Sequence, residues 1–106
     1  ADVVSCARGK LKELGYQQAS YDEIENRMSA RKIDNTVHRP DPQFRRNVNR
    51  IEIETAAGAD GKTAMKVVGH TFAEYSTQRG PTEVEERAST DVNEASQAVV
   101  QACGQA

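Results

Sequence analysis

The fold of this chain is decided by TDVNEASQAVVQAC, residues 90–103, the last periodic segment of the sequence. Its apolar and small residues recur at helical spacing, as expected for one face of an α-helix: Val92, Ala95, Ser96, Val99, Ala102 and Cys103. Polar residues fill most of the other positions. We therefore predict an amphipathic helix that ends in a cysteine and packs its apolar stripe on a core.

The boundaries of this helix carry recognisable signals. Asp91 and Glu94 have the spacing of an N-terminal capping box, and Ser89 and Thr90 compete with Asp91 as the capping residue. Gly104 follows the cysteine as a helix stop. These signals leave the first residue of the helix open by one or two positions.

The same periodicity occurs at the other end of the chain. Val3, Ala7, Leu11 and Leu14 form an apolar stripe over residues 2–14, and Gly15 follows as a stop. This segment is predicted to be the first helix. If it runs antiparallel to the last helix, its beginning lies beside that helix's end.

Cys6 and Cys103 are the two cysteines of the chain, one on each predicted helix. Such a pair indicates a disulfide in an oxidising compartment more readily than a redox or metal site. On the chain-entropy model a loop of that length stabilises the fold by roughly 4 to 5 kcal/mol. The alternative is lipid attachment at Cys6, because Val3-Val4-Ser5-Cys6 is loosely similar to the end of a lipoprotein signal.

Residues 16–21 are weakly strand-like, and two interpretations are open for residues 20–34. A capping box beginning at Ser20, with Ile24 and Met28 one turn apart, would give a short helix. The rival is a hairpin with a turn near residues 22–26 and a strand over residues 27–34. We favour the hairpin, because the helix would bury too few apolar residues.

The centre of the chain contains a stronger hairpin. Residues 35–49 include Pro40 and Pro42 and are predicted to be a long irregular loop. Residues 50–55 alternate apolar and acidic side chains as a half-buried strand does. An Asp60-Gly61 turn then leads to a long strand over residues 62–75. Residues 77–82 are predicted to be a loop, and residues 83–87 a short edge strand or an extended lead-in.

The order of these elements predicts the fold class. We expect one α+β domain over residues 1–106, with an antiparallel sheet of three to four strands and the N- and C-terminal helices packed on one face as a two-layer sandwich. The two faces of the long strand separate Met65, Val67 and Gly69 from Val68 and Phe72. The second set then lies on an open face.

Composition limits the classes of partner. The formal net charge is -2, which argues against a nucleic-acid-binding domain. The chain contains no apolar run of the roughly 18 residues that a transmembrane helix needs. Its start at Ala1-Asp2 is what signal-peptide cleavage leaves, although a chain trimmed by hand would start in the same way. The placement of the two cysteines decides, and we expect an extracytoplasmic protein that is periplasmic, secreted or on the cell surface, where it could associate peripherally with the envelope.

The chain resembles small bacterial cell-envelope domains of unknown function, many of them lipoproteins. The resemblance spans most of the chain and rests on Leu14-Gly15-Tyr16, Arg27-Met28-Ser29-Ala30-Arg31, Arg50-Ile51-Glu52-Ile53, Lys66-Val67-Val68-Gly69-His70-Thr71 and a closing helix with a cysteine. The resemblance implies an envelope location. It gives no catalytic residues that could be assigned to positions of this chain. The chain differs from a lipoprotein in having five residues before Cys6.

The sequence gives little support for a catalytic site or a metal site. Glu52, Glu54 and His70 are expected on one sheet face, a geometry that would suit acid–base catalysis or a metal, but an exposed polar face explains them better. The spacing of His38 and His70 fits no zinc motif. We predict no catalytic residues, no metal, no cofactor and no enzyme activity.

Two stretches have the composition of a contact surface. One is the basic loop with Arg39, Arg45 and Arg46 beside Phe44, because an aromatic among arginines is typical of an interface anchor. The other is the strip formed by Val68, His70 and Phe72, which lies on the open face if Met65 and Val67 face the helices. The alternative is that this strip packs under the long loop. An acidic patch also precedes the last helix, including Glu83, Glu85, Glu86, Asp91 and Glu94, so a head-to-tail contact between copies is chemically reasonable.

The leading functional hypothesis is a non-enzymatic extracytoplasmic domain that acts through protein contacts. It is either a structural subunit that self-associates or an adaptor or inhibitor that binds another protein. One alternative is a module that holds a lipid or small anionic ligand between helices and sheet. A less favoured alternative is a hydrolase that uses Glu52, Glu54 and His70.

Overall fold

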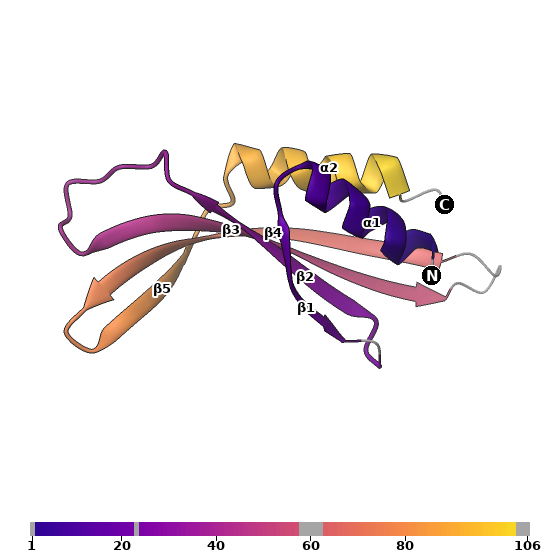
Figure 1. The fold of residues 1–106 in the computed structure, drawn as a ribbon, viewed down its shortest axis with the longest axis horizontal. Coiled ribbons are helices and arrows are strands. Elements are labelled where there is room, and N and C mark those ends of the chain that lie inside the picture. Colours follow the sequence, from indigo (N-terminus) through magenta and orange to yellow (C-terminus); the bar gives the residue numbers. More distant parts are fainter. Residues whose placement is uncertain (1, 23, 58–62, 104–106) are drawn as a thin grey trace.

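The computed structural model describes residues 2–22, 24–57 and 63–103 as two helices on one face of a five-stranded sheet (Figure 1). The elements are α1 (Asp2–Glu13), β1 (Gln17–Asp22), β2 (Arg27–Asp34), β3 (Phe44–Ala57), β4 (Thr63–Thr77), β5 (Gly80–Glu86) and α2 (Thr90–Cys103). The predicted α+β class and the helix-on-sheet arrangement are confirmed. The predicted number of strands, three to four, is too low.

The sheet is an antiparallel meander in the order β1-β2-β3-β4-β5. β3 and β4 are its longest strands, with 14 and 15 residues, and they extend well beyond the helices (Figure 1). The molecule is therefore elongated, with extents of 52 × 25 × 20 Å. The helices cover only one half of the long hairpin.

The β1–β2 hairpin settles the two interpretations of residues 20–34. The Asp22 carboxylate accepts hydrogen bonds from the amides of Ile24 and Glu25, at 3.0 and 3.2 Å, and forms an Asx turn. Asn26 completes the turn with a φ of 55°. The hairpin prediction is confirmed, and the helix alternative is wrong because Asp22 caps a turn and not a helix.

Two predicted connections differ from the structure. β3 already begins at Phe44, so the irregular loop covers residues 35–43 only. β4 and β5 are joined by a tight turn in which Thr77 pairs with Gly80, and Pro81 lies on the edge strand, where a missing N–H is tolerated. The predicted Asp60-Gly61 turn and the Gly104 stop lie outside the described residues.

The core lies between the helices and the sheet. Its buried cluster comprises Ala7, Leu11, Tyr16, Met28, Ala30, Ile51, Ile53, Val92, Ala95 and Val99. Gly69 lets α2 approach β4 closely, because a Cβ there would lie 2.9 Å from Ser96 Oγ and 3.1 Å from a Val92 methyl. This glycine therefore permits close packing and does not leave a cavity.

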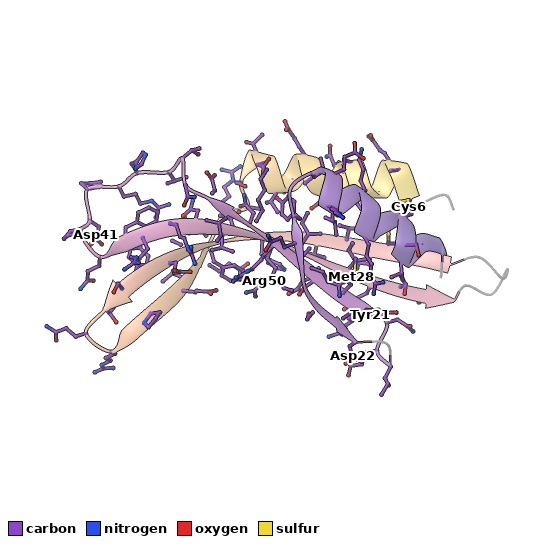
Figure 2. The ribbon with its side chains drawn as sticks, viewed as in Figure 1. Cys6, Tyr21, Asp22, Met28, Asp41 and Arg50 are labelled. Atoms are coloured by element: carbon purple, nitrogen blue, oxygen red, sulfur yellow. A yellow bond between two sulfur atoms is a disulfide. The ribbon has the colours of Figure 1, made fainter. Side chains whose placement is uncertain are left out.

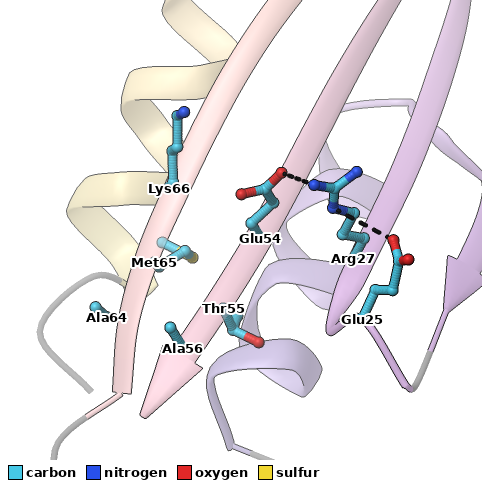
Figure 3. A pocket seen from close by; sticks show the side chains of 8 residues that line it. All are labelled: Glu25, Arg27, Glu54, Thr55, Ala56, Ala64, Met65 and Lys66. Carbon is cyan, nitrogen blue, oxygen red and sulfur yellow. Dashed lines mark ion pairs between the residues drawn. The ribbon is translucent and has the colours of Figure 1, made fainter. Parts of the chain in front are cut away.

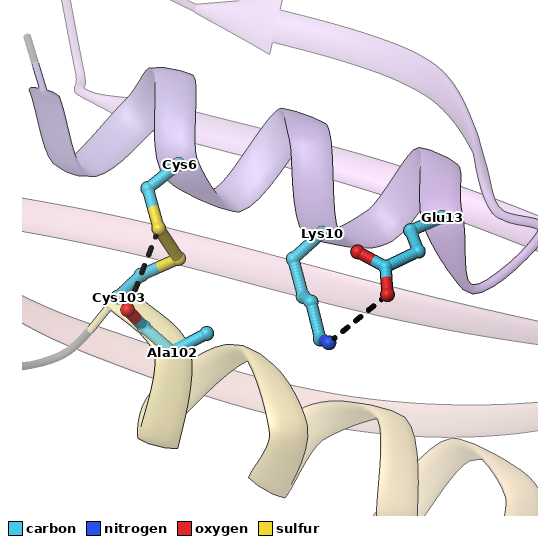
Figure 4. The surroundings of a disulfide bond; sticks show 5 residues. All are labelled: Cys6, Lys10, Glu13, Ala102 and Cys103. Carbon is cyan, nitrogen blue, oxygen red and sulfur yellow. Dashed lines mark hydrogen bonds and ion pairs between the residues drawn. A yellow bond between two sulfur atoms is a disulfide. The ribbon is translucent and has the colours of Figure 1, made fainter.

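Cys6 and Cys103 form a disulfide, as predicted, with their Cα atoms 5.7 Å apart (Figure 4). α1 and α2 run antiparallel, so the beginning of α1 meets the end of α2 (Figures 1 and 4). Cys103 is fully buried. The bond thus fixes both helices to each other across a sequence separation of 97 residues.

A polar network fixes the other end of α2. Ser89 is the capping residue, because its Oγ accepts a hydrogen bond from the Val92 amide at 3.2 Å. The same Oγ donates to Asn49 Oδ1 at 2.9 Å, which also accepts from Thr71 Oγ1 at 2.8 Å. Asn49 and Thr71 are 1% and 2% exposed. The start of α2 is thereby hydrogen-bonded to the two central strands.

Asp91 extends this network to β2 and to the segment that follows α1. It accepts hydrogen bonds from the Tyr16 hydroxyl at 3.2 Å and from Asn49 Nδ2 at 3.4 Å, and it lies 3.7 Å from Lys32 Nζ. Burial and the neighbouring Asp91 carboxylate raise the pKa of Tyr16. Asp91 therefore joins the first turn of α2 to three other parts of the chain through polar groups.

Candidate functional site

We use the name open face for the side of the sheet opposite the helices. The register of β3 and β4 places Arg50 opposite His70, Glu52 opposite Val68, and Val48 opposite Phe72. These side chains point away from the helices, since their neighbours Ile51 and Ile53 belong to the core. The predicted separation of Val68, His70 and Phe72 from Met65, Val67 and Gly69 is therefore correct.

Phe72 lies at the centre of the open face. The Arg50 guanidinium carbon is 4.8 Å from its ring centroid, and the His70 ring centroid is 6.1 Å away. Val48, opposite Phe72 in register, is only 2% exposed. Figure 2 shows Arg50 in the middle of the sheet. The open face thus has a small apolar centre with a cation stacked on it.

Carboxylates surround this centre. His70 Nδ1 lies 2.9 Å from Glu85 Oε2, and His70 Nε2 lies 3.8 Å from Glu52 Oε2. Arg50 Nη2 lies 3.8 Å from Glu83. Both ring nitrogens of His70 therefore face a carboxylate. The expected cluster of Glu52 and His70 forms, while Glu54 instead pairs with Arg27 at 3.1 Å.

Arg39, in the loop that precedes β3, contacts side chains of this same chain. Arg39 makes a two-pronged ion pair with Glu86, at 2.6 and 2.5 Å, and donates to the Tyr75 hydroxyl at 3.2 Å. Its guanidinium also stacks on the Phe44 ring, 4.7 Å from the centroid. Hydrogen bonds from Arg39 lower the pKa of the Glu86 carboxyl. The loop is therefore fastened to β5 by its own arginine.

Arg46 behaves in the same way on the neighbouring strands. Its Nε lies 3.2 Å from the Glu74 carboxylate of β4. Together with the Arg39–Glu86 and Arg50–Glu83 pairs, this shows that the basic and acidic patches meet within one molecule. The charge argument for a head-to-tail contact is therefore weakened. Arg45 is exposed, and no carboxylate among the described residues forms an ion pair with it.

A hollow of ≈ 470 Å³ lies at the other end of the β3–β4 hairpin (Figure 3). Arg27 is one of its lining residues and contacts Glu54 at 3.1 Å and Glu25 at 3.7 Å. Met65, Ala56 and Ala64 also line it. Because Arg27, Glu25 and Glu54 already pair with one another, these charges are not left free to select a ligand.

Metal-ligating side chains are scattered over the described part of the chain. Within residues 2–22, 24–57 and 63–103, histidine, cysteine and acidic side chains nowhere gather in threes with the geometry for a metal ion. Neither helix among these residues has the length and apolar character to cross a membrane.

No protein-family model, curated protein or solved structure matches this chain.

Sequence patterns predicted which side chains lie on the open face, but not which carboxylates pair with the arginines. Alternation in residues 50–55 and 62–75 was sufficient to assign faces. The partners of Arg39, Arg46 and Arg50 are set by strand register and by β5, which the sequence did not resolve. One usable signal was present: the glutamates Glu83 and Glu85 alternate as those of an edge strand do.

Proposed function

We propose that this chain is a non-enzymatic, extracytoplasmic protein-interaction domain whose contact surface is the open face of its sheet. The observation that carries the proposal is Phe72, partly exposed at the centre of that face and stacked by Arg50 at 4.8 Å. Aromatic residues and arginine are the side chains most enriched where binding energy concentrates in protein interfaces.

The surroundings of Phe72 support the same interpretation. Val68 and His70 extend the apolar centre along β4, and both are partly exposed. Glu52, Glu83 and Glu85 form a charged rim around them. An apolar centre within a polar rim is the usual anatomy of a specific protein contact.

The geometry of His70 favours binding over catalysis. A catalytic histidine needs one ring nitrogen directed at the substrate. Here Glu85 and Glu52 face the two nitrogens, at 2.9 and 3.8 Å. The third residue of the hydrolase alternative, Glu54, pairs with Arg27 at 3.1 Å, so the expected cluster of Glu52, Glu54 and His70 is incomplete.

The disulfide supports the proposed compartment. A Cys6–Cys103 bond persists in the periplasm or outside the cell, whereas cytosolic thiols are kept reduced. The core is small and contains several alanines, so a bond that closes a loop of 97 residues is expected to add substantially to stability. Both observations agree with an envelope or secreted protein.

The test is co-isolation of the partner from an extracytoplasmic extract of the organism that makes the chain. Tagged wild-type protein is compared with Phe72→Ser and with Val100→Ser, whose side chain is 45% exposed on the opposite layer. The proposal predicts one partner with wild type and Val100→Ser and its loss with Phe72→Ser. Equal recovery with all three proteins would overturn it.

Sedimentation of the purified chain at several concentrations separates the two versions of the proposal. A structural subunit shows a concentration-dependent increase in mass that Phe72→Ser abolishes. An adaptor or inhibitor remains a monomer throughout, which removes the self-associating version and leaves the open face for another protein.

A further inference from the structure

The two edges of the sheet are built differently. β5 (Gly80–Glu86) has Pro81 and three glutamates, which are devices that discourage pairing with another strand. β1 has neither proline nor lysine, and all six of its residues are exposed. Its irregularity is a bulge between Gln18 and Ser20. As the outermost strand, β1 presents alternate backbone N–H and C=O groups to the outside.

An apolar groove of ≈ 370 Å³ lies beside this edge, between α1 and the start of β1. Its floor is formed by Leu11, Tyr16, Met28 and Ala30. Figure 2 shows Met28 below α1, toward the edge of the sheet where β1 lies. The groove therefore connects a free strand edge with apolar side chains of the core.

Cations line the rim of the groove. Arg8 and Lys12 come from one face of α1, and both are exposed. Arg8 stacks on Tyr21 of β1, with 4.7 Å between its guanidinium carbon and the ring centroid. Neither cation forms an ion pair within the described part of the chain. The rim thus differs from the open face, where the arginines have carboxylate partners.

We infer that β1 and this groove bind an extended acidic peptide segment of a partner protein, which adds to the sheet as a sixth strand. Backbone groups of β1 supply the pairing, and one apolar side chain of the peptide enters the groove. Arg8 and Lys12 are separated by about 6 Å along the helix. Carboxylates on alternate residues of a strand, about 7 Å apart, match that spacing.

This site is separate from the open face, so the inference stands or falls independently of the proposed function. A second copy of the chain is a poor occupant, because pairing β1 with β1 would bring two cationic rims together. An anionic amphiphile would satisfy the cations and the groove but would leave the edge of β1 unpaired.

The experiment uses the whole disulfide-bonded chain and the peptide acetyl-Glu-Thr-Glu-Thr-Val-Thr-amide, which places two carboxylates and one apolar side chain on the same face. Binding is followed by fluorescence anisotropy of labelled peptide at low ionic strength. Hydrogen exchange of the β1 amides is measured with and without peptide. We expect saturable binding and slower exchange at alternate residues of β1.

Charge reversal provides the specific control. Arg8→Glu with Lys12→Glu is expected to weaken binding about tenfold or more, since two attractive contacts become repulsive. Arg79→Glu with Arg87→Glu makes the same change in net charge at exposed positions near β5 and should leave binding unchanged. A peptide with glutamine at both acidic positions should also bind wild type more weakly, a result that does not depend on the folding of any variant.

Four results would overturn the inference. They are failure of the acidic peptide to bind, equal binding of the glutamine peptide, protection of β5 in place of β1, and displacement of the peptide by dodecanoate that shifts Leu11 and Met28 without protecting β1. The last result would assign the groove to an anionic amphiphile.

Discussion

Ser89 Oγ donates a hydrogen bond to the buried Asn49 Oδ1 at 2.9 Å, and through it the first turn of α2 is attached to the middle of β3. Thr71 of β4 donates to the same oxygen at 2.8 Å. One side-chain oxygen thus joins the helix to both central strands. The disulfide at the other end of α2 makes the second attachment.

Removal of the shared acceptor is expected to destabilise the fold. Asn49→Ala leaves the Thr71 and Ser89 hydroxyls without their acceptor, and we expect a loss of about 2 kcal/mol or more in the free energy of unfolding. Urea denaturation measures it. Thr82→Val, at an exposed position of β5, is the control and should change little. A loss below about 0.5 kcal/mol for Asn49→Ala would show that the network does not fix the helix.

Loss of the disulfide is expected to have the largest effect on stability. Cys6→Ser with Cys103→Ser should lower the free energy of unfolding by up to about 4 to 5 kcal/mol on the chain-entropy model, because the bond spans 97 residues. Guanidinium denaturation of the variant and the oxidised protein measures the difference. A thiol assay on the denatured, unreduced wild type should find no free thiol, and two titratable thiols would contradict the bond itself.

Glycine-to-alanine substitution should act with opposite sign at two positions. Gly69→Ala places a methyl 3.1 Å from Val92 and 2.9 Å from Ser96, and we expect a loss of about 1 to 3 kcal/mol. A methyl at Gly9 of α1 would meet nothing within 4 Å, so Gly9→Ala should stabilise by about 0.5 to 1 kcal/mol. Thermal unfolding compares them, and a stabilising Gly69→Ala would refute the close packing of α2 on β4.

Acid should destabilise the protein through carboxyls with a lowered pKa. Hydrogen bonds from Arg39 lower the pKa of Glu86 below its usual 4.5, and those from Thr36 lower the pKa of Asp34 below 3.8. Groups of this kind stabilise the fold above their unfolded pKa and lose that effect as the pH falls through the folded pKa. Stability should therefore decline below about pH 4.5.

Arg39→Gln isolates the contribution of Glu86 to that decline. The variant should be less stable at pH 7 and should lose less stability on acidification, because its Glu86 titrates closer to its usual value. Denaturation midpoints between neutral and acidic pH measure both effects. Identical pH profiles for variant and wild type would contradict the linkage.

Much of the fold follows from local patterns in the sequence. The stripe of Val92, Ala95 and Val99 predicts α2, and a helix that begins at residue 2 and ends before Gly15 follows from the same periodicity. Alternation around Ile51 and Ile53 predicts the central strand and its two faces. Opposite placement of the cysteines predicts the disulfide. These features depend on residues within a few positions of each other or on a single pair.

The missed features depend on partners far apart in the chain. Asn47 and Asn49 interrupt the apolar alternation, so the sequence of the first half of β3 resembles that of a loop. Asn49 is nevertheless buried, because its side-chain oxygen accepts hydrogen bonds from Thr71 and Ser89. The arginines of the predicted contact loop looked available because their carboxylate partners lie 28 to 47 positions away. Sequence patterns do not specify the register between strands. That register determines both the burial of Asn49 and the ion pairs of the arginines.

The open face as the contact surface is tested most directly by photo-crosslinking. A photoreactive residue replaces Val68 in one protein and Val100 in another, and each is irradiated in the same extracytoplasmic extract. We predict one dominant adduct from position 68 that disappears when Phe72→Ser is added, and no matching adduct from position 100. Equal adducts from both positions, or an adduct from position 68 that survives Phe72→Ser, would show that the open face is not the contact surface.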